Sequence, residues 1–263
     1  MKIVVCIKQV PDTKGGVKFN PDGTLDRSAM MAIMNPDDKA GLEAALRLKD
    51  QYGAEVTVVT MGLPKAEEVL REAMAMGADN GVLVTDRVLG GADTWATSQT
   101  IAGALRNLDY DLIITGRQAI DGDTAQVGPQ IAEKLHLPQV TYAADIKKDG
   151  DTITVQRMLE DGYMTIKVQT PCLLTCIKEL NNPRYMSIGG ILSTYSKPLT
   201  TLGYEDLKDH PLIDATTIGL KGSPTNIFKS FTPPQKGAGM MLEGADKATC
   251  EKLAGILAAK HII

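Results

Sequence analysis

Short apolar runs alternate with segments of helical periodicity through the first 145 residues of the chain. The apolar runs lie at 3–7, 55–60, 81–85, 111–115 and 139–143. The first, residues 3–7, is continuously apolar, which is typical of a strand buried on both faces of a sheet. Between them the sequence predicts helices at 36–52, from Pro64 to about Gly77, at 93–108 and at 124–135. This alternation predicts an α/β fold with a doubly wound, mostly parallel sheet of the Rossmann-like type.

Two stretches depart from this alternation. Residues 11–29 are rich in Gly, Pro and Asp and predict a series of turns. Apolar runs at 152–155 and 164–168 flank Gly162 and predict an added β-hairpin, because short alternating runs around a glycine turn are typical of one. A further strand is predicted at 172–177.

The last part of the chain has a different composition. Residues 215–242 contain three lysines, three prolines and no acidic residue, which predicts an extended arm. An amphipathic helix follows at 245–260, and a short helix beyond such a tether is expected to dock on a partner. We therefore predict an α/β domain over 1–214 and a C-terminal arm over 215–263.

Composition limits the chemistry of the chain. Its 263 residues carry a net charge of −4 and only 4% aromatic residues, which argues against a nucleic-acid partner. The three histidines are dispersed and the four cysteines form no CxxC pair, so we expect no metal site, disulfide framework or nucleophilic triad. No signal peptide or membrane span is evident, and we expect a cytoplasmic protein. Any chemistry would then come from a bound cofactor.

A first candidate ligand site follows the fourth predicted strand. Ligands of open parallel sheets bind beyond the carboxyl ends of strands. Gly116 and Gly122 permit close approach of the backbone, and Asp123 or Thr124 is expected to cap a helix whose free amides would bind phosphate. Spacing alone leaves an ordinary strand-turn-helix corner as an equal alternative. Other candidate contacts are Arg117 for charge, Asp121 for a ribose hydroxyl, and Gln126 as a neutral donor.

A second candidate corner lies at residues 90–98. It combines Gly90 and Gly91 with a capping Asp93, clustered hydroxyl groups and the single tryptophan of the chain. Helix capping is the commoner explanation for such a corner taken alone. The GxGxxG and GxxxxGK[ST] fingerprints are both missing, so neither common phosphate-binding motif applies.

More specific motifs are spread over nearly the whole chain. They are Lys8–Asp12, Met34–Pro36, Met74–Asp79, Gly116–Asp121, Leu159–Gly162, Thr170–Thr175, Asn182–Tyr185, Ile188 and Lys197–Pro198. Together they resemble the signature of the electron-transfer flavoprotein β subunit. The resemblance implies a nucleotide-binding α/β core, and a C-terminal arm that wraps an α subunit carrying its own FAD.

The resemblance also implies one of two ligands in the β subunit. Non-bifurcating members hold a structural AMP, whereas electron-bifurcating members hold a second FAD that oxidises NADH. The bifurcating members pass one electron to ferredoxin or flavodoxin, and the other through the α-subunit FAD to an acyl-CoA dehydrogenase. Residues 90–98 resemble the bifurcating group, although Gly90 departs from the alanine-like residue of some members, so FAD is favoured over AMP. A nucleotide-sensing module remains the alternative of a different class.

The family's functional positions carry over to named residues of this chain. No catalytic side chain is implied, because the chemistry would be borne by the flavin, and whether the subunit itself counts as an enzyme stays open. The docking loop for the dehydrogenase would be 184–196, with Arg184, Tyr185 and Ile188 as the contacts. The cofactor contacts would be Cys6, Asn35, Asp37, Asp38, Met61, Gly91, Ala92, Asp93, Thr94, Thr97, Gly116, Gln118, Ala119, Ile120, Asp121, Gly122, Asp123, Thr124, Ala125, Gln126 and Val127.

Overall fold

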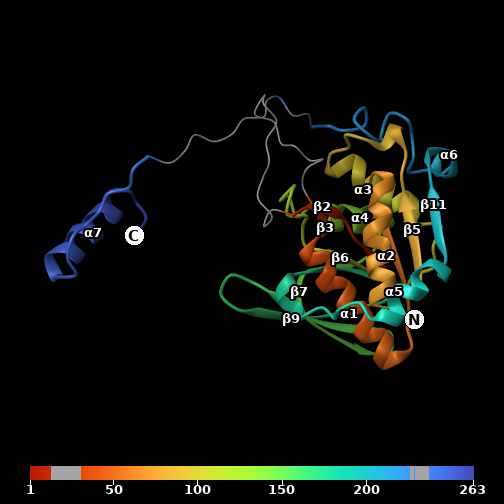
Figure 1. Cartoon of the computed structure of the whole chain (residues 1–263), viewed down its shortest axis with the longest axis horizontal. Helices are drawn as coiled ribbons and strands as arrows, with labels where there is room; N and C mark the ends of the chain where they lie inside the picture. Colours follow the sequence, from red (N-terminus) through yellow and green to blue (C-terminus); the bar gives the residue numbers. More distant parts are fainter. Residues whose placement is uncertain (13–30, 226–227, 229–236) are drawn as a thin grey trace.

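A nine-stranded sheet forms the centre of the molecule (Figure 1), which is described here from a computed structural model. The structure describes residues 1–12, 31–225, 228 and 237–263, so the turns predicted at 11–29 lie almost wholly outside it. The strands follow the order β11-β5-β4-β1-β6-β10-β7-β8-β9. Their bounds are β1 Lys2–Cys6, β4 Glu55–Met61, β5 Asn80–Val84, β6 Leu112–Gly116, β7 Gln139–Asp149, β8 Thr152–Met158, β9 Tyr163–Gln169, β10 Cys172–Cys176 and β11 Leu199–Leu202.

The direction of the strands confirms the predicted fold class. In this nine-stranded sheet all pairs from β11 to β7 are parallel, whereas β7 with β8 and β8 with β9 are antiparallel. The chain builds outward from β1 to β4 and β5, and then returns to place β6 on the other side of β1. The strand order therefore reverses at β1 and β6, which is the point where ligands of such sheets bind.

Helices cover both faces of the sheet, as a doubly wound fold requires. The helices are α1 Pro36–Tyr52, α2 Glu67–Met76, α3 Thr94–Leu105, α4 Val127–Leu135, α5 Ile188–Ser193, α6 Tyr204–Leu207 and α7 Lys247–Ala259, with short 3₁₀ turns η3 Pro64–Ala66, η4 Arg87–Leu89, η5 Lys178–Leu180 and η6 Thr194–Ser196. Ile3 and Val5 of β1 pack in the core with α1 and α2, whereas Val4 packs in the core with α3 and α4. The alternation explains why a strand with two buried faces is a continuous apolar run.

Some elements differ from the predicted ones. The strand predicted at 139–143 extends to Asp149, because the second half of β7 pairs with β8 to begin the projecting hairpin. The strand β10 inserts between β6 and β7, so these two consecutive strands are not neighbours. The edge strand β11 was not predicted, and a small antiparallel sheet of β2 Gln9–Pro11 and β3 Ala32–Met34 lies beside the main one.

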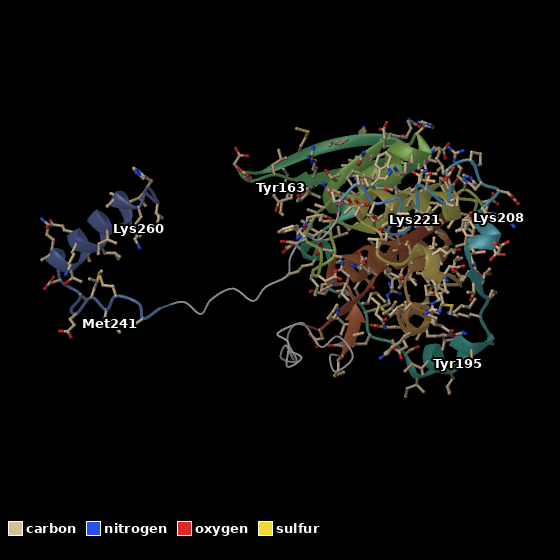
Figure 2. The ribbon with its side chains drawn as sticks, turned by 90° about the horizontal axis from the view of Figure 1, so that it is seen from above. Tyr163, Tyr195, Lys208, Lys221, Met241 and Lys260 are labelled. Carbon is tan, nitrogen blue, oxygen red and sulfur yellow. The ribbon has the colours of Figure 1, made fainter. Side chains whose placement is uncertain are left out.

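The C-terminal segment consists of two differing parts. Residues 215–225, placed in the arm by the sequence, lie against the α/β domain: Ile218 and Ser223 are buried there. The predicted terminal helix is confirmed as α7, which has no buried residue and lies apart from the domain in both views (Figures 1 and 2). No helix within the described residues is both long and apolar enough to cross a membrane.

Candidate functional site

Asp38 joins the two strands at which the strand order reverses. Its Oδ2 accepts the Lys8 amide just past β1 at 2.8 Å, and its Oδ1 accepts the Gly116 amide at the end of β6 at 3.0 Å. A Cβ at Gly116 would overlap with Asp38 Oδ1, so this glycine is required by Asp38 rather than by a ligand. Burial raises the pKa of Asp38 to about 7, although hydrogen bonds from Asn35, Lys8 and Gly116 lower it.

Asn35 holds the loop that follows β6. Its Nδ2 donates to the Gln118 carbonyl at 2.8 Å, and its Oδ1 accepts the Ile120 amide at 3.1 Å. Asn35 occupies the N-cap position of α1 before Pro36, but it makes no side-chain cap bond. The side chain is fully buried and is used for the loop, which brings Asn35 and residues 118–120 into one site.

The helix after this loop begins later than the sequence predicts. α4 starts at Val127 with Gln126 at its N-cap, so the expectation that Asp123 or Thr124 caps the helix is wrong. Asp123 and Ala125 have positive φ values of 53° and 52°, which places them outside the helical region. Gln118 Nε2 instead donates to Asp123 Oδ1 across the turn.

The late start of α4 leaves a run of free amides. Within the described residues, no hydrogen bond uses the backbone amides of residues 124–128. Thr124 and Gln126 are exposed, and no atom lies within 4 Å of a Cβ built on Gly122. Consecutive amides at a helix N-terminus are a good site for phosphate, because their partial positive charges point at one spot. These residues therefore fit the phosphate groups of a nucleotide cofactor.

Lys8 is the site residue that the sequence analysis missed. Its Nζ lies 2.7 Å from Asp121 Oδ1, and its backbone amide donates to Asp38. Lys8 therefore links the loop after β6 to the first turn of α1. The available signal was its position directly after the first buried strand. Arg117, by contrast, pairs with Asp37 Oδ2 at 3.3 Å and lies over the Tyr142 ring at 5.9 Å, so its charge is already matched.

The second corner begins α3. Asp93 is its N-cap, as predicted, and Asp93 Oδ1 accepts the Ala96 amide at 3.0 Å. Its Oδ2 accepts both the amide and the hydroxyl of Thr225, at 3.0 and 2.8 Å, while its own amide donates to Ser223 Oγ. Burial acts to raise the pKa of Asp93, but the hydrogen bonds from Ala96 and Thr225 lower it overall. Both carboxylate oxygens of Asp93 are thus hydrogen-bonded within the protein, one to the start of α3 and the other to Thr225.

The two corners meet in the folded chain. Thr94 Oγ1 donates to Gln126 Oε1 at 2.9 Å, which links the start of α3 to the N-cap of α4. Cys6 and Met61 lie partly buried at the ends of β1 and β4, and burial raises the pKa of the Cys6 thiol to about 12. The remaining predicted contacts, Gly91, Ala92, Thr97 and Ala119, are exposed or half-buried at the same two corners.

The predicted docking loop, residues 184–196, is a separate surface. Tyr185 and Ile188 are 96% and 80% exposed. The Arg184 guanidinium points inward and bonds the buried carboxylate of Glu43 at 2.8 Å and Asp50 at 2.7 Å, which raises its pKa. Arg184 therefore anchors this segment to α1.

Known proteins are similar to this chain over its full length. Residues 22–207 match the electron transfer flavoprotein domain. The chain belongs to the electron transfer flavoprotein family. Over the full length of both chains, it is 63% identical to the acryloyl-CoA reductase electron transfer subunit gamma of Anaerotignum propionicum. It is 53% identical to the caffeyl-CoA reductase-Etf complex subunit CarD of Acetobacterium woodii and 51% identical to the electron transfer flavoprotein subunit beta of Clostridium acetobutylicum, again over the full chains. The resemblance to the electron-transfer flavoprotein β subunit is thus confirmed.

Proposed function

We propose that this flavoprotein chain is the β subunit of an electron-bifurcating heterodimer, and that its own pocket holds FAD. The observation that carries the proposal is the convergence of the two corners, with the free amides of residues 124–128 beside Thr94. The named acryloyl-CoA and caffeyl-CoA reductase relatives support it. Bound FAD would supply hydride acceptance from NADH and electron transfer to two acceptors.

In this proposal, different residues of the chain bind different parts of the cofactor. The amides of residues 124–128 hold the phosphate groups of the cofactor. Asn35 and Asp38 fix the position of the loop, and the Lys8–Asp121 pair borders it. The turn at residues 91–97 lies at the flavin end, with Thr94 joining it to the phosphate end.

The partners follow from two further surfaces. The helix α7 has no buried residue, so it packs on the α subunit in the proposed heterodimer. The exposed Tyr185 and Ile188 would dock an acyl-CoA dehydrogenase, or a related acyl-CoA reductase, as the high-potential acceptor. Ferredoxin or flavodoxin would take the low-potential electron.

The nucleotide content of the purified heterodimer tests the proposal. Two FAD released on denaturation, with bleaching of the bound flavin by NADH, is the expected result. One FAD with one AMP would identify a non-bifurcating carrier instead. Binding of ATP or AMP by this chain alone, with no flavin partner, would identify a nucleotide sensor.

A further inference from the structure

A cavity lies outside the candidate cofactor site. Its volume is about 410 Å³, which is within the usual range for small-molecule sites. It is formed where η4 and Gly90 meet the segment from α6 to Lys221, so its walls come from two parts of the chain that are far apart in sequence. Lys221 lies on the α/β domain and well apart from Tyr195 of the docking loop (Figure 2).

The wall of this cavity is apolar and exposed. Ile218 is 2% exposed and packs in the domain core, but Val88 and Leu220 are 51% and 60% exposed. The wall is held in place, because the Leu220 amide donates to the Gly90 carbonyl at 3.0 Å and the Tyr204 amide to Asp86 Oδ2 at 3.0 Å. A concave surface with exposed apolar side chains favours the apolar part of a ligand.

Two cations line the same cavity. Arg87 and Lys221 are exposed, and neither forms an ion pair or side-chain hydrogen bond with any residue that the structure describes. The neighbouring carboxylate of Asp86 forms no ion pair with either of them and accepts the amides of Val88 and Tyr204. An arginine and a lysine beside one apolar wall suit a phosphate group joined to a flat apolar body.

We propose that this cavity binds a nucleoside diphosphate. The phosphates lie between Arg87 and Lys221, and the base lies against Val88, Leu220 and Tyr204. The cavity is separate from the free amides of residues 124–128, so the proposal does not depend on which nucleotide the cofactor pocket holds. The ligand chemistry has two sources, free ADP and the ADP half of NADH, of which the second rests on the proposed function. Gly90 in the wall adjoins the turn at residues 91–97.

Calorimetric titration of the purified heterodimer tests this inference, with ADP and NAD⁺ as separate probes. Arg87→Gln and Lys221→Gln each remove one charge, and each is expected to weaken binding about tenfold. Val88→Trp fills the cavity and is expected to abolish binding with both charges kept. Lys65→Gln removes an exposed lysine elsewhere and is the matched control, with unchanged affinity expected.

The two probes separate the sources. Weakened ADP binding supports a site for free nucleotide, and weakened NAD⁺ binding without ADP binding supports the dinucleotide. Absence of binding by both probes, or affinities that the two charge variants leave unchanged, overturns the inference. The nucleotide released from each variant on denaturation is measured in parallel. An unchanged release would show that the cofactor pocket, and with it the proposed function, is independent of this result.

Discussion

Thr94 Oγ1 donates a hydrogen bond to Gln126 Oε1 at 2.9 Å, and this contact joins two corners that lie 32 residues apart in the chain. Ordinary helix capping by Asp93 explains the corner at α3, whereas the corner before α4 has no side-chain cap. Together they present the free amides of residues 124–128 and the turn at residues 91–97 to the same space. The candidate cofactor site is thus formed by the two corners together and by neither of them alone.

Thr94→Val tests this link by removing the hydroxyl at nearly constant volume. A single neutral hydrogen bond contributes about 1 kcal/mol, so we expect about fivefold weaker retention of the β-site nucleotide. Retention is measured as the nucleotide released during dialysis in mild denaturant. Thr201→Val on the exposed edge strand β11 is the control, and equal loss from both variants would contradict the assigned role.

Gly116→Ala is expected to destabilise the fold even without a ligand. The added Cβ overlaps with Asp38 at the point where β1 and β6 are joined, and overpacking of this kind costs about 1–3 kcal/mol. The matched variant is Gly122→Ala, whose Cβ meets no atom within 4 Å. Urea unfolding should separate the two, and equal midpoints would rule out a structural need for Gly116.

Asp38 should make stability fall as the pH rises. Burial raises its pKa from 3.8 to about 7 in the folded chain, so the folded state retains a proton that the unfolded state has lost. Its stabilising contribution is complete below about pH 4 and is lost as the pH approaches 7, a change of at most about 4 kcal/mol.

Comparison of Asp38→Asn with the parent chain isolates this effect. The difference in unfolding free energy between the two chains should change over this pH range, whereas Asp161→Asn on the exposed hairpin turn should track the parent throughout. A pH-independent difference for Asp38→Asn would show that Asp38 has an ordinary pKa.

Arg184→Met should lower stability, because it leaves the buried carboxylate of Glu43 with Arg47 as its remaining partner. Removing one member of a buried ion pair costs about 3 kcal/mol, and the partial exposure of Arg184 reduces this. Ile188→Ala, at an exposed position, should leave unfolding unchanged but slow electron transfer to the proposed acyl-CoA dehydrogenase or reductase partner. The reverse pattern would mean that Arg184 contacts the partner directly.

Deletion of residues 231–263 should abolish assembly with the α subunit and leave a folded domain. The reason is that α7 buries no residue within this chain, so it contributes nothing to the packing of the sheet. Size-exclusion chromatography and circular dichroism report the two properties separately. A truncated chain that still assembled would show that the interface lies elsewhere.

The helices and strands were predicted correctly where burial gives the apolar residues a regular spacing along the sequence. The helix predicted at 36–52 is α1, and the apolar run at 3–7 is a strand with alternate residues in the two cores. The prediction failed at the start of α4, because a polar loop with Asp123 and Ala125 at positive φ has no apolar period to mark where the helix begins. The edge strand β11 was missed for the same reason, since none of its residues is buried.

The amino-acid sequence alone determined the parallel α/β sheet, the two polar corners and the flavoprotein family of this chain. The reason is that the spacing of apolar residues and the short motifs are local properties of the sequence. Only the tertiary structure decided what the corner residues contact. It assigned Asp93 to Ser223 and Thr225, Arg184 to Glu43, and Lys8 to Asp121. These residues are far apart in sequence, so the contacts form only in the folded chain. The Lys8–Asp121 contact forms where the carboxyl ends of β1 and β6 lie side by side.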